Sequence, residues 1–582
     1  MYDLELFKHI FAFNPNSPLL FTQFYFWAFF AVIYLLFALI IEGTPALKER
    51  TRLHLRNVFL MFVSWFFYYK TSGSFLLILI TLTFTNWSIA FGIRHALDRH
   101  RMWAARLWMG LSITINLAFL FYYKYAYFGV DIFNSVFGTH YSIVNQILLP
   151  VGISFYTFQV ISYTVDIFRG VVKPVTNILD FGFYVSFFPQ LVAGPIVRAS
   201  EFVPQLYKPF HLSRRLFGLA VFWIVNGLAK KIILSDYLAV NLIDRVFDNP
   251  LLFSGFENLF ALFAYSLQVY ADFSGYTDIA TGVAMLMGFY LPRNFDSPYK
   301  SRNPQEFWRR WHQSLSRWLK SYVYIPLGGN RTIFGRKVSK LWASNVNSFA
   351  TMLIGGLWHG ASWNFVIWGG LNGVGMIVNK IWREWGWYIR VLFITFLLTG
   401  LIIWRSAVQA PLLNLACVWV AILWVGTMIC FLYWWLNVIT RRGPKIHRWE
   451  TVLTNALANA WAVMQTFTFI TFTRLFFRSS SNLDPATASE TAWQTAVDMI
   501  GQIGGAWNNA IILPFLTEYW KVVALFVAGM IIHWLPTNLK RRYRIAFASL
   551  PIPVMIIAVC IVVFVIYQFV TADMQPFIYF QF

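Results

Sequence analysis

Apolar runs about as long as a membrane-spanning helix recur along the whole chain, and they constrain its fold more than any other feature. The first extends from Leu20 to Ile41. A helix needs about 20 apolar residues to cross the roughly 30 Å hydrocarbon core of a bilayer. Of the 582 residues, 58% are hydrophobic and only 12% are charged, against about 25% charged in soluble domains. The sequence therefore predicts an all-α, polytopic membrane protein with about 11–16 transmembrane or re-entrant helices.

The basic residues indicate which loops face the cytoplasm. The net charge of +22 would suggest a nucleic-acid partner in a soluble protein, but here the basic residues lie in short loops beside apolar runs, the pattern of cytoplasmic loops. We therefore expect no nucleic-acid partner. If the final apolar run, 550–570, crosses the membrane from the cytoplasmic basic cluster at 540–544, the C-terminus is extracytoplasmic. The clusters are Lys48, Arg50, Arg52 and Arg56; Arg94, Arg99, Arg101 and Arg106; Arg441, Arg442, Lys445 and Arg448; and 540–544.

No linker or polar block is large enough to form a second folded domain. We expect a single membrane domain over residues 15–570 and an extracytoplasmic tail over 571–582. The longest polar stretch, 478–505, predicts a loop with a short amphipathic helix. No group of His, Cys and carboxylate residues stands at ligand spacing, so we expect no metal site.

The stretch "SRNPQEFWRRWHQSLSRWLKSYVYIP" predicts an amphipathic interfacial helix. Asn303 is placed as its N-cap, Pro304 as its first residue, and Glu306 three residues after the cap. The apolar face of this helix comprises Phe307, Trp308, Trp311, Leu315, Trp318, Leu319 and Tyr322. At 100° per residue His312 falls about 20° beyond that face, on the border with the basic face, where its side chain could look into a cavity.

A second histidine, His359, lies in the apolar, glycine-rich stretch "GGLWHGASWNF". Glycines around it would let backbones or a slender ligand approach closely. An apolar pocket would also keep the imidazole neutral, as a general base requires. The alternative is a structural interhelical hydrogen bond, worth roughly 0.6–2 kcal/mol in a membrane. We expect Trp311, Trp358 and Asn364 to support the cavity around the histidines.

Two carboxylates in "YADFSGYTDIATG", Asp272 and Asp278, lie in an apolar run, where acidic residues are costly. They are expected to pair with Arg or Lys or to cap a broken helix, and to support the cavity rather than to carry chemistry. The stretch "FFPQLVAGPIVR" places Pro189, Gly194 and Pro195 in another apolar run. This combination predicts a kink or a re-entrant loop.

These motifs, in this order, resemble those of the membrane-bound O-acyltransferases, and most closely the bacterial branch that acetylates alginate or peptidoglycan or transfers D-alanine to teichoic acid. The resemblance covers roughly residues 15–400 and the extreme C-terminus. It implies that His359 corresponds to the characteristic histidine of the family and His312 to its partner, and that both act in acyl transfer. It leaves open which of the two is the base.

The last seven residues, "PFIYFQF", would by themselves be an aromatic anchor at the membrane interface. They also resemble the tail of alginate-type acetyltransferases, in which the tyrosine is proposed to carry the acyl group. The resemblance therefore implies that Tyr579 is an acyl carrier. Because the pKa of an unperturbed phenol is about 10, Tyr579 would need a base such as His359 before attacking a thioester.

The predicted function is that of an inner-membrane O-acetyltransferase, with acetyl-CoA as the donor substrate and no permanently bound cofactor. Arg331, Arg336 and Lys337 would hold the CoA phosphates. The acetyl group would reach an exported polysaccharide, such as alginate or peptidoglycan, through a separate SGNH-type periplasmic acetyltransferase partner. Two alternatives are a multipass transporter or channel, and a lipid acyltransferase of the same family.

Overall fold

The computed structural model describes residues 12–14, 18–42, 47–144, 146–333, 335–439, 448–481, 488–505, 507–570 and 577. Over these residues the secondary structure is helical except for one two-stranded antiparallel sheet, formed by β1 (Thr332–Ile333) and β2 (Arg336–Lys337). The predicted all-α class is confirmed. The chain divides into two compact units: unit 1 comprises residues 1–236, 270–294 and 536–582, and unit 2 comprises 237–269 and 295–535.

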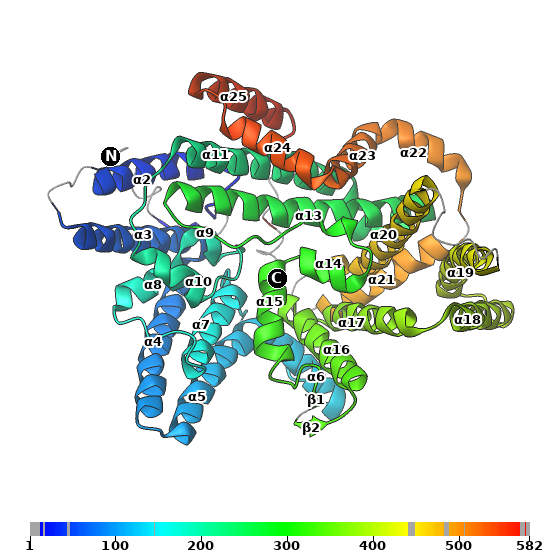
Figure 1. Cartoon of the computed structure of the whole chain (residues 1–582), viewed down its shortest axis with the longest axis horizontal. Helices are drawn as coiled ribbons and strands as arrows, with labels where there is room; N and C mark the ends of the chain where they lie inside the picture. Colours follow the sequence, from blue (N-terminus) through cyan, green and yellow to red (C-terminus); the bar gives the residue numbers. More distant parts are fainter. Residues whose placement is uncertain are drawn as a thin grey trace. The chain divides into compact units, whose positions relative to one another are not determined.

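Unit 1 contains the N-terminal helices and the last two helices of the chain, together with the second half of the long helix α13 (Gly255–Leu286). Antiparallel neighbours such as α4 (Leu76–Asp98) and α5 (Met102–Leu120) lie side by side in it (Figure 1). Its other helices are α2 (Phe24–Glu42), α3 (Glu49–Ser72), η1 (Gly73–Phe75), α4 (Leu76–Asp98), α5 (Met102–Leu120), η2 (Phe121–Tyr125), α6 (Ala126–Phe137), α7 (Ile153–Phe168), α8 (Ile178–Ser186), α9 (Phe188–Leu191), α10 (Ala199–Leu206), α11 (Arg214–Ala229), η3 (Lys230–Asp236), α24 (Thr537–Ala548) and α25 (Ile552–Gln568).

Unit 2 contains the first half of α13 and the two-stranded sheet. Its helices α16 (Lys340–His359) and α17 (Trp363–Glu384) form an adjacent pair (Figure 1). Its other helices are η4 (Ala239–Ile243), α12 (Asp244–Asp248), η5 (Pro250–Leu252), η6 (Pro298–Lys300), α14 (Pro304–Arg310), α15 (Gln313–Leu319), η7 (Lys320–Tyr324), α16 (Lys340–His359), α17 (Trp363–Glu384), α18 (Trp387–Ala407), α19 (Pro411–Ile439), α20 (Arg448–Ser479), α21 (Ala488–Gly504), η8 (Asn509–Ile511), α22 (Ile512–Glu518) and α23 (Trp520–Trp534). The 17-residue helix α21 occupies most of the stretch predicted as a loop with a short helix.

Six helices in the described part of the chain are long and apolar enough to cross a membrane, or up to eight if each of two bent helix pairs is one span. The predicted 11–16 helices also counted re-entrant ones and apolar runs that the protein itself buries. Helix α7 is such a run, because every residue from Ile153 to Ile167 is buried. An apolar run alone does not distinguish a helix facing lipid from a helix facing protein.

Small residues allow α11 to lie directly against the second half of α13. A Cβ atom added at Gly227 would lie 2.5 Å from the carbonyl oxygen of Gly275, and one added at Gly282 would lie 2.6 Å from that of Ala220. Helices in membranes use such small residues because close backbone approach increases van der Waals contact. A larger side chain at either glycine would force the two helices apart.

The same region of unit 1 holds ion pairs within η3, a π-helix, and between η3 and α13. Lys231 Nζ lies 2.5 Å from Asp272 Oδ1 and 2.8 Å from Asp236 Oδ1, and all three side chains are at most 6% exposed. Lys230 Nζ lies 2.7 Å from Asp278 Oδ2. The predicted pairing of both carboxylates of α13 with basic residues is therefore confirmed, and neither caps a helix because both lie inside α13.

The predicted break in "FFPQLVAGPIVR" is also present in unit 1. Helix α8 ends at Ser186, the single turn α9 (Phe188–Leu191) follows, and the chain is non-helical from Ala193 to Arg198. Residues 187–197 are all buried. A Cβ atom at Gly194 would lie 2.3 Å from the Cα atom of Gln190, so this turn requires glycine. Irregular backbone is tolerated inside a membrane protein when other protein segments cover it, as they do here.

We predict that Lys231→Met strongly destabilises the protein, because it leaves two buried carboxylates without their shared cation. Breaking one side of a buried ion pair costs about 3–5 kcal/mol. The apparent melting temperature of the detergent-solubilised protein measures the loss. Arg94→Gln is the control, because the Arg94–Asp98 pair is about half exposed and such surface pairs are worth about 0–1 kcal/mol. Equal melting temperatures for the two variants would contradict the prediction.

Candidate active site

The stretch that carries His312 forms two short helices, and the prediction of one continuous amphipathic helix was wrong. The start is as predicted: Asn303 caps α14, its side-chain oxygen accepting a hydrogen bond of 2.9 Å from the backbone N–H of Glu306, and Pro304 is the first residue. The helix ends at Arg310, Trp311 is extended, and His312 adopts the left-handed conformation with φ 42° and ψ 57° before α15 begins. A non-glycine residue in this conformation costs on the order of 1–3 kcal/mol and persists only where its surroundings enforce it.

This break places His312 inside the protein rather than on the border of an amphipathic helix. Its exposed fraction is 0%, and Ser314 Oγ lies 3.5 Å from its Nδ1 atom. Burial lowers the pKa of the imidazole from its ordinary value of 6.5 to about 3, because the charged form loses its hydration. His312 is therefore neutral at physiological pH. Five predicted apolar positions are buried as expected: Phe307, Trp311, Leu315, Trp318 and Leu319.

His359 is the last residue of α16 and is 3% exposed. Its ring lies 4.9 Å from the ring of Trp358, 4.9 Å from that of Trp368 and 5.3 Å from that of Phe477, measured between centroids. The imidazole thus lies in an aromatic box contributed by α16, α17 and α20. We call His312, His359, Trp358, Trp368 and Phe477 the histidine cluster.

Trp358 connects the two histidines. The centroid of its ring is 5.9 Å from that of His312 and 4.9 Å from that of His359, and the tryptophan is 3% exposed. The structure therefore unites two residues that are 47 positions apart in the sequence. The sequence predicted that Trp358 supports the cavity, and in the structure its ring packs against the rings of both histidines.

Glycines near His359 serve the packing of α16 against α17. A Cβ atom at Gly356 would lie 2.4 Å from the carbonyl oxygen of Phe365, and one at Gly369 would lie 2.4 Å from that of Met352. A Cβ atom at Gly360 would lie 2.0 Å from the ring of Phe365. Gly356 and Gly369 bring backbones together, which is one of the two roles that the sequence suggested for these glycines, whereas Gly360 leaves room for a ring.

Polar atoms without partners lie beside the aromatic box. Asn364 Nδ2 donates to Ser479 Oγ and to the carbonyl oxygen of Ala492, each at 2.9 Å, and so links α17 to α20 and α21. Within the described residues, Asn364 Oδ1, Asn372 Oδ1 and Trp308 Nε1 are buried without a hydrogen-bond partner. Leaving such an atom unsatisfied costs about 1–3 kcal/mol, which suits a site that receives water or a polar ligand.

Helix α20 provides a charged residue that the sequence analysis missed. Arg474 is 4% exposed, and its guanidinium lies 4.3 Å from the ring of Trp311. Its Nη1 atom donates to the carbonyl oxygen of Ser266 and to the hydroxyl of Tyr299. No carboxylate lies within 4 Å of this guanidinium in the part of the chain that the structure describes. The sequence did hold a signal for Arg474, because it lies within the apolar run "FTFITFTRLFF". Intramembrane charges are costly and tend to be functional.

The predicted CoA-binding residues lie at the opposite end of α16 from His359. Arg331, Arg336 and Lys337 are exposed on the β1–β2 hairpin that precedes the helix. Asn347 Nδ2 fastens this hairpin by donating to the carbonyl oxygens of Gly329 and Thr332, at 2.8 and 2.7 Å. The 20 residues of α16 span about 30 Å, so the hairpin is not part of the histidine cluster.

The remaining predicted site residues belong to unit 1 or lie outside the described residues. Asp272 and Asp278 pair with lysines of unit 1. Tyr579 lies outside the described residues, but Phe577, two positions earlier, is 1% exposed. Its ring centroid is 4.7 Å from that of Tyr276, and Lys231 Nζ lies 4.7 Å from the same ring.

Comparison with known proteins shows which family the chain resembles. The profile of MBOAT, the membrane-bound O-acyltransferase family, matches residues 172–386. The chain is 41% identical over 330 residues to the probable alginate O-acetylase AlgI of Pseudomonas aeruginosa, covering 56% of this chain and 61% of that protein. It is 39% identical over 362 residues to the probable alginate O-acetylase AlgI of Pseudomonas syringae pv. tomato, covering 60% and 67%. It is 36% identical over 354 residues to the peptidoglycan O-acetyltransferase of Helicobacter pylori, covering 56% and 65%.

The fold and the site define a multipass, all-helical membrane protein with two buried histidines in one aromatic cluster. The chain belongs to the membrane-bound O-acyltransferase family. It spans 61–67% of the length of these three curated relatives. Both histidines lie within the residues that the family profile matches, whereas Arg474 and Tyr579 lie beyond them.

We predict that burial of His312 makes the protein less stable as the pH falls. The unfolded chain binds a proton at His312 below about pH 6.5, whereas the folded chain stays neutral there until about pH 3. The unfolded state therefore gains protons first, and the free energy of unfolding falls by up to about 1.4 kcal/mol per pH unit. Between about pH 6 and pH 5 the melting temperature of His312→Gln should fall less steeply with pH than that of the wild type. The control, exposed His140→Gln, should keep the wild-type slope, and an unchanged slope in His312→Gln would refute the prediction.

We also predict that His312→Gly is more stable than His312→Ala by about 1 kcal/mol, because glycine adopts a positive φ without the cost of a Cβ atom. Melting temperatures of the two variants measure the difference. The matched control is Ser316, which lies inside α15. There we expect Ser316→Gly to be less stable than Ser316→Ala, since glycine within a helix is less stable than alanine by about 1 kcal/mol. A more stable alanine variant at both positions would show that His312 is not strained.

Proposed function

We propose that this protein is an O-acetyltransferase that passes acetyl groups from cytoplasmic acetyl-CoA toward an extracytoplasmic polysaccharide. The observation that carries the proposal is the pair of buried histidines joined through Trp358, within the residues that match the acyltransferase family. The relatives' names, alginate O-acetylase and peptidoglycan O-acetyltransferase, support an exported glycan as the final acceptor.

Of the two histidines, we assign His359 as the proton acceptor. It ends a 20-residue helix, and the partial negative charge at a helix C-terminus stabilises an imidazolium by about 0.3–1 kcal/mol or more when partly buried. His312 has a strongly lowered pKa and stays neutral. It therefore serves to orient or hydrogen-bond the reacting groups.

In the first transfer, an acceptor hydroxyl gives its proton to His359 as its oxygen forms an ester bond with the acetyl carbonyl carbon. The C–S bond of acetyl-CoA breaks, and the CoA thiolate takes the proton from the imidazolium. A positioned base of this kind contributes about 10²–10⁴ in rate. The first acceptor in this scheme is the phenol of Tyr579. A hydroxyl of an SGNH-type periplasmic partner then takes the acetyl group by transesterification, which restores the phenol.

Two observations support the placement of donor and carrier. The exposed basic hairpin with Arg331, Arg336 and Lys337 offers hydrogen bonds to the CoA phosphates at the far end of α16 from His359. The burial of the Phe577 ring, against Tyr276 and Lys231, supports the carrier role because this residue lies only two positions before Tyr579 in the sequence. In this proposal the protein lies in the inner membrane, CoA remains cytoplasmic and only the acetyl group crosses.

The purified protein is incubated with isotope-labelled acetyl-CoA, and the label is mapped by peptide mass spectrometry. We expect label on Tyr579 in the wild type and in the control Tyr567→Phe, whose tyrosine is 73% exposed on α25. The label should be absent in Tyr579→Phe and reduced by about 10²–10⁴ in rate in His359→Ala.

The outcomes separate the two parts of the proposal. Acetyl-CoA consumption without label on Tyr579 would retain the acyltransferase and remove the tyrosine carrier. If acetyl-CoA is neither bound nor consumed, even when a periplasmic partner is supplied, the acyltransferase itself is refuted. Equal label in His359→Ala and the wild type would remove His359 as the base.

A further inference from the structure

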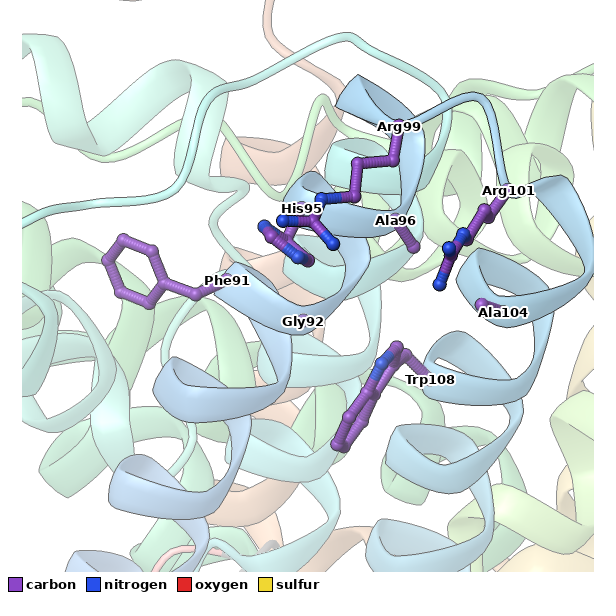
Figure 2. A pocket seen from close by; sticks show the side chains of 8 residues that line it. All are labelled: Phe91, Gly92, His95, Ala96, Arg99, Arg101, Ala104 and Trp108. Atoms are coloured by element: carbon purple, nitrogen blue, oxygen red, sulfur yellow. The ribbon is translucent and has the colours of Figure 1, made fainter.

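A pocket of about 470 Å³ lies at the end of the α4–α5 helix pair, far along the sequence from the histidine cluster. His95, Arg99 and Arg101 line it, and Trp108 lies between the two helices below them (Figure 2). The connection from α4 to α5 has only three residues, of which His100 has a φ of 56°. This tight turn holds the two arginines on either side of the pocket.

The basic groups of this pocket have no neutralising carboxylate. Within the described part of the chain, no carboxylate oxygen lies within 4 Å of Arg99 or Arg101. The nearby Asp98 is already paired, because its Oδ1 atom lies 2.8 Å from Arg94 Nη2. The pocket therefore presents two uncompensated guanidinium groups and an imidazole, a set suited to a phosphate, which arginine can bind with two parallel hydrogen bonds.

The other end of the pocket is apolar and continues into surfaces suited to lipid. The indole of Trp108 packs on α4 where there is no side chain, because a Cβ atom at Gly92 would lie 2.8 Å from the ring. Trp108 is 41% exposed, and Phe91, also in the lining, is 37% exposed. Both α4 and α5 lie in segments long and apolar enough to cross a membrane. The pocket thus joins a basic end at the loop to an apolar end at the membrane.

We propose that this pocket binds the headgroup of an anionic phospholipid. Arg99 and Arg101 hold the phosphate, His95 contacts the headgroup, and the start of an acyl chain lies along Trp108. The loop belongs to a basic cluster that the positive-inside rule places in the cytoplasm, so the lipid comes from the cytoplasmic leaflet. Basic pockets between membrane helices on that side bind anionic headgroups in this way. A freely soluble phosphate would use the arginines but not the apolar end.

Native mass spectrometry of the full-length protein in detergent tests this site with phosphatidylglycerol, and with phosphatidylethanolamine as the zwitterionic comparison. We expect tighter binding of phosphatidylglycerol and a roughly fivefold weaker affinity for it in Arg99→Gln and in Arg101→Gln. Arg106→Gln is the matched control, because Arg106 is exposed on α5 in the same basic cluster but does not line the pocket. Its affinity should change less than about twofold.

Three results would overturn the proposal. Equal weakening in all three arginine variants would show general attraction to the basic surface rather than a site. Equal binding of phosphatidylglycerol and phosphatidylethanolamine would show that the negative charge is not recognised. Displacement of the lipid by inorganic phosphate or by CoA at comparable concentrations, with Trp108→Ala leaving lipid binding unchanged, would assign the pocket to a soluble phosphate ligand.

Discussion

A main chain in hydrocarbon has to satisfy its own hydrogen-bonding groups, and the rest of this structure depends on that constraint. It makes the apolar runs helical and confines departures from the helix to places that protein covers. The buried turn at 187–197 in unit 1 is one such place, with Gly194 at its closest approach. The break at Trp311 and His312 in unit 2 is another, because both residues are buried. The same scarcity of water requires Lys231 to be placed between two aspartates.

The histidine cluster follows from where helices end. His312 lies between two short helices, and His359 ends α16. At such positions a side chain can turn into the protein without interrupting a long helix, and the electrostatic environments differ. Burial keeps His312 neutral, whereas His359 lies at the C-terminus of α16, where the helix dipole interacts favourably with positive charge. The two histidines therefore lie in different electrostatic environments.

Glycines allow close contact between helices, and that contact positions the side chains next to it. Gly356 and Gly369 bring α16 and α17 into backbone contact, which sets the distance between Trp358 and Trp368 on either side of His359. In unit 1, Gly227 and Gly275 do the same for α11 and α13, next to the buried ion pairs. In both units close helix contact fixes side chains that carry charge or could carry a proton.

The amino-acid sequence alone determined the helical class and the start of α14 at Asn303 and Pro304, and it marked Asp272 and Asp278 as carboxylates that need a basic partner or a helix end. These features depend on local hydrogen bonding or on the cost of polar groups in apolar surroundings, which act over a few residues. It did not determine the break at His312, because a regular 100° repeat continued through it, nor the 17-residue length of α21. The tertiary structure alone decided that Trp358 joins His312 to His359 and that α20 adds Arg474 and Phe477. Those contacts connect residues up to 163 positions apart, as between Trp311 and Arg474, and no local pattern specifies which distant segments pack together.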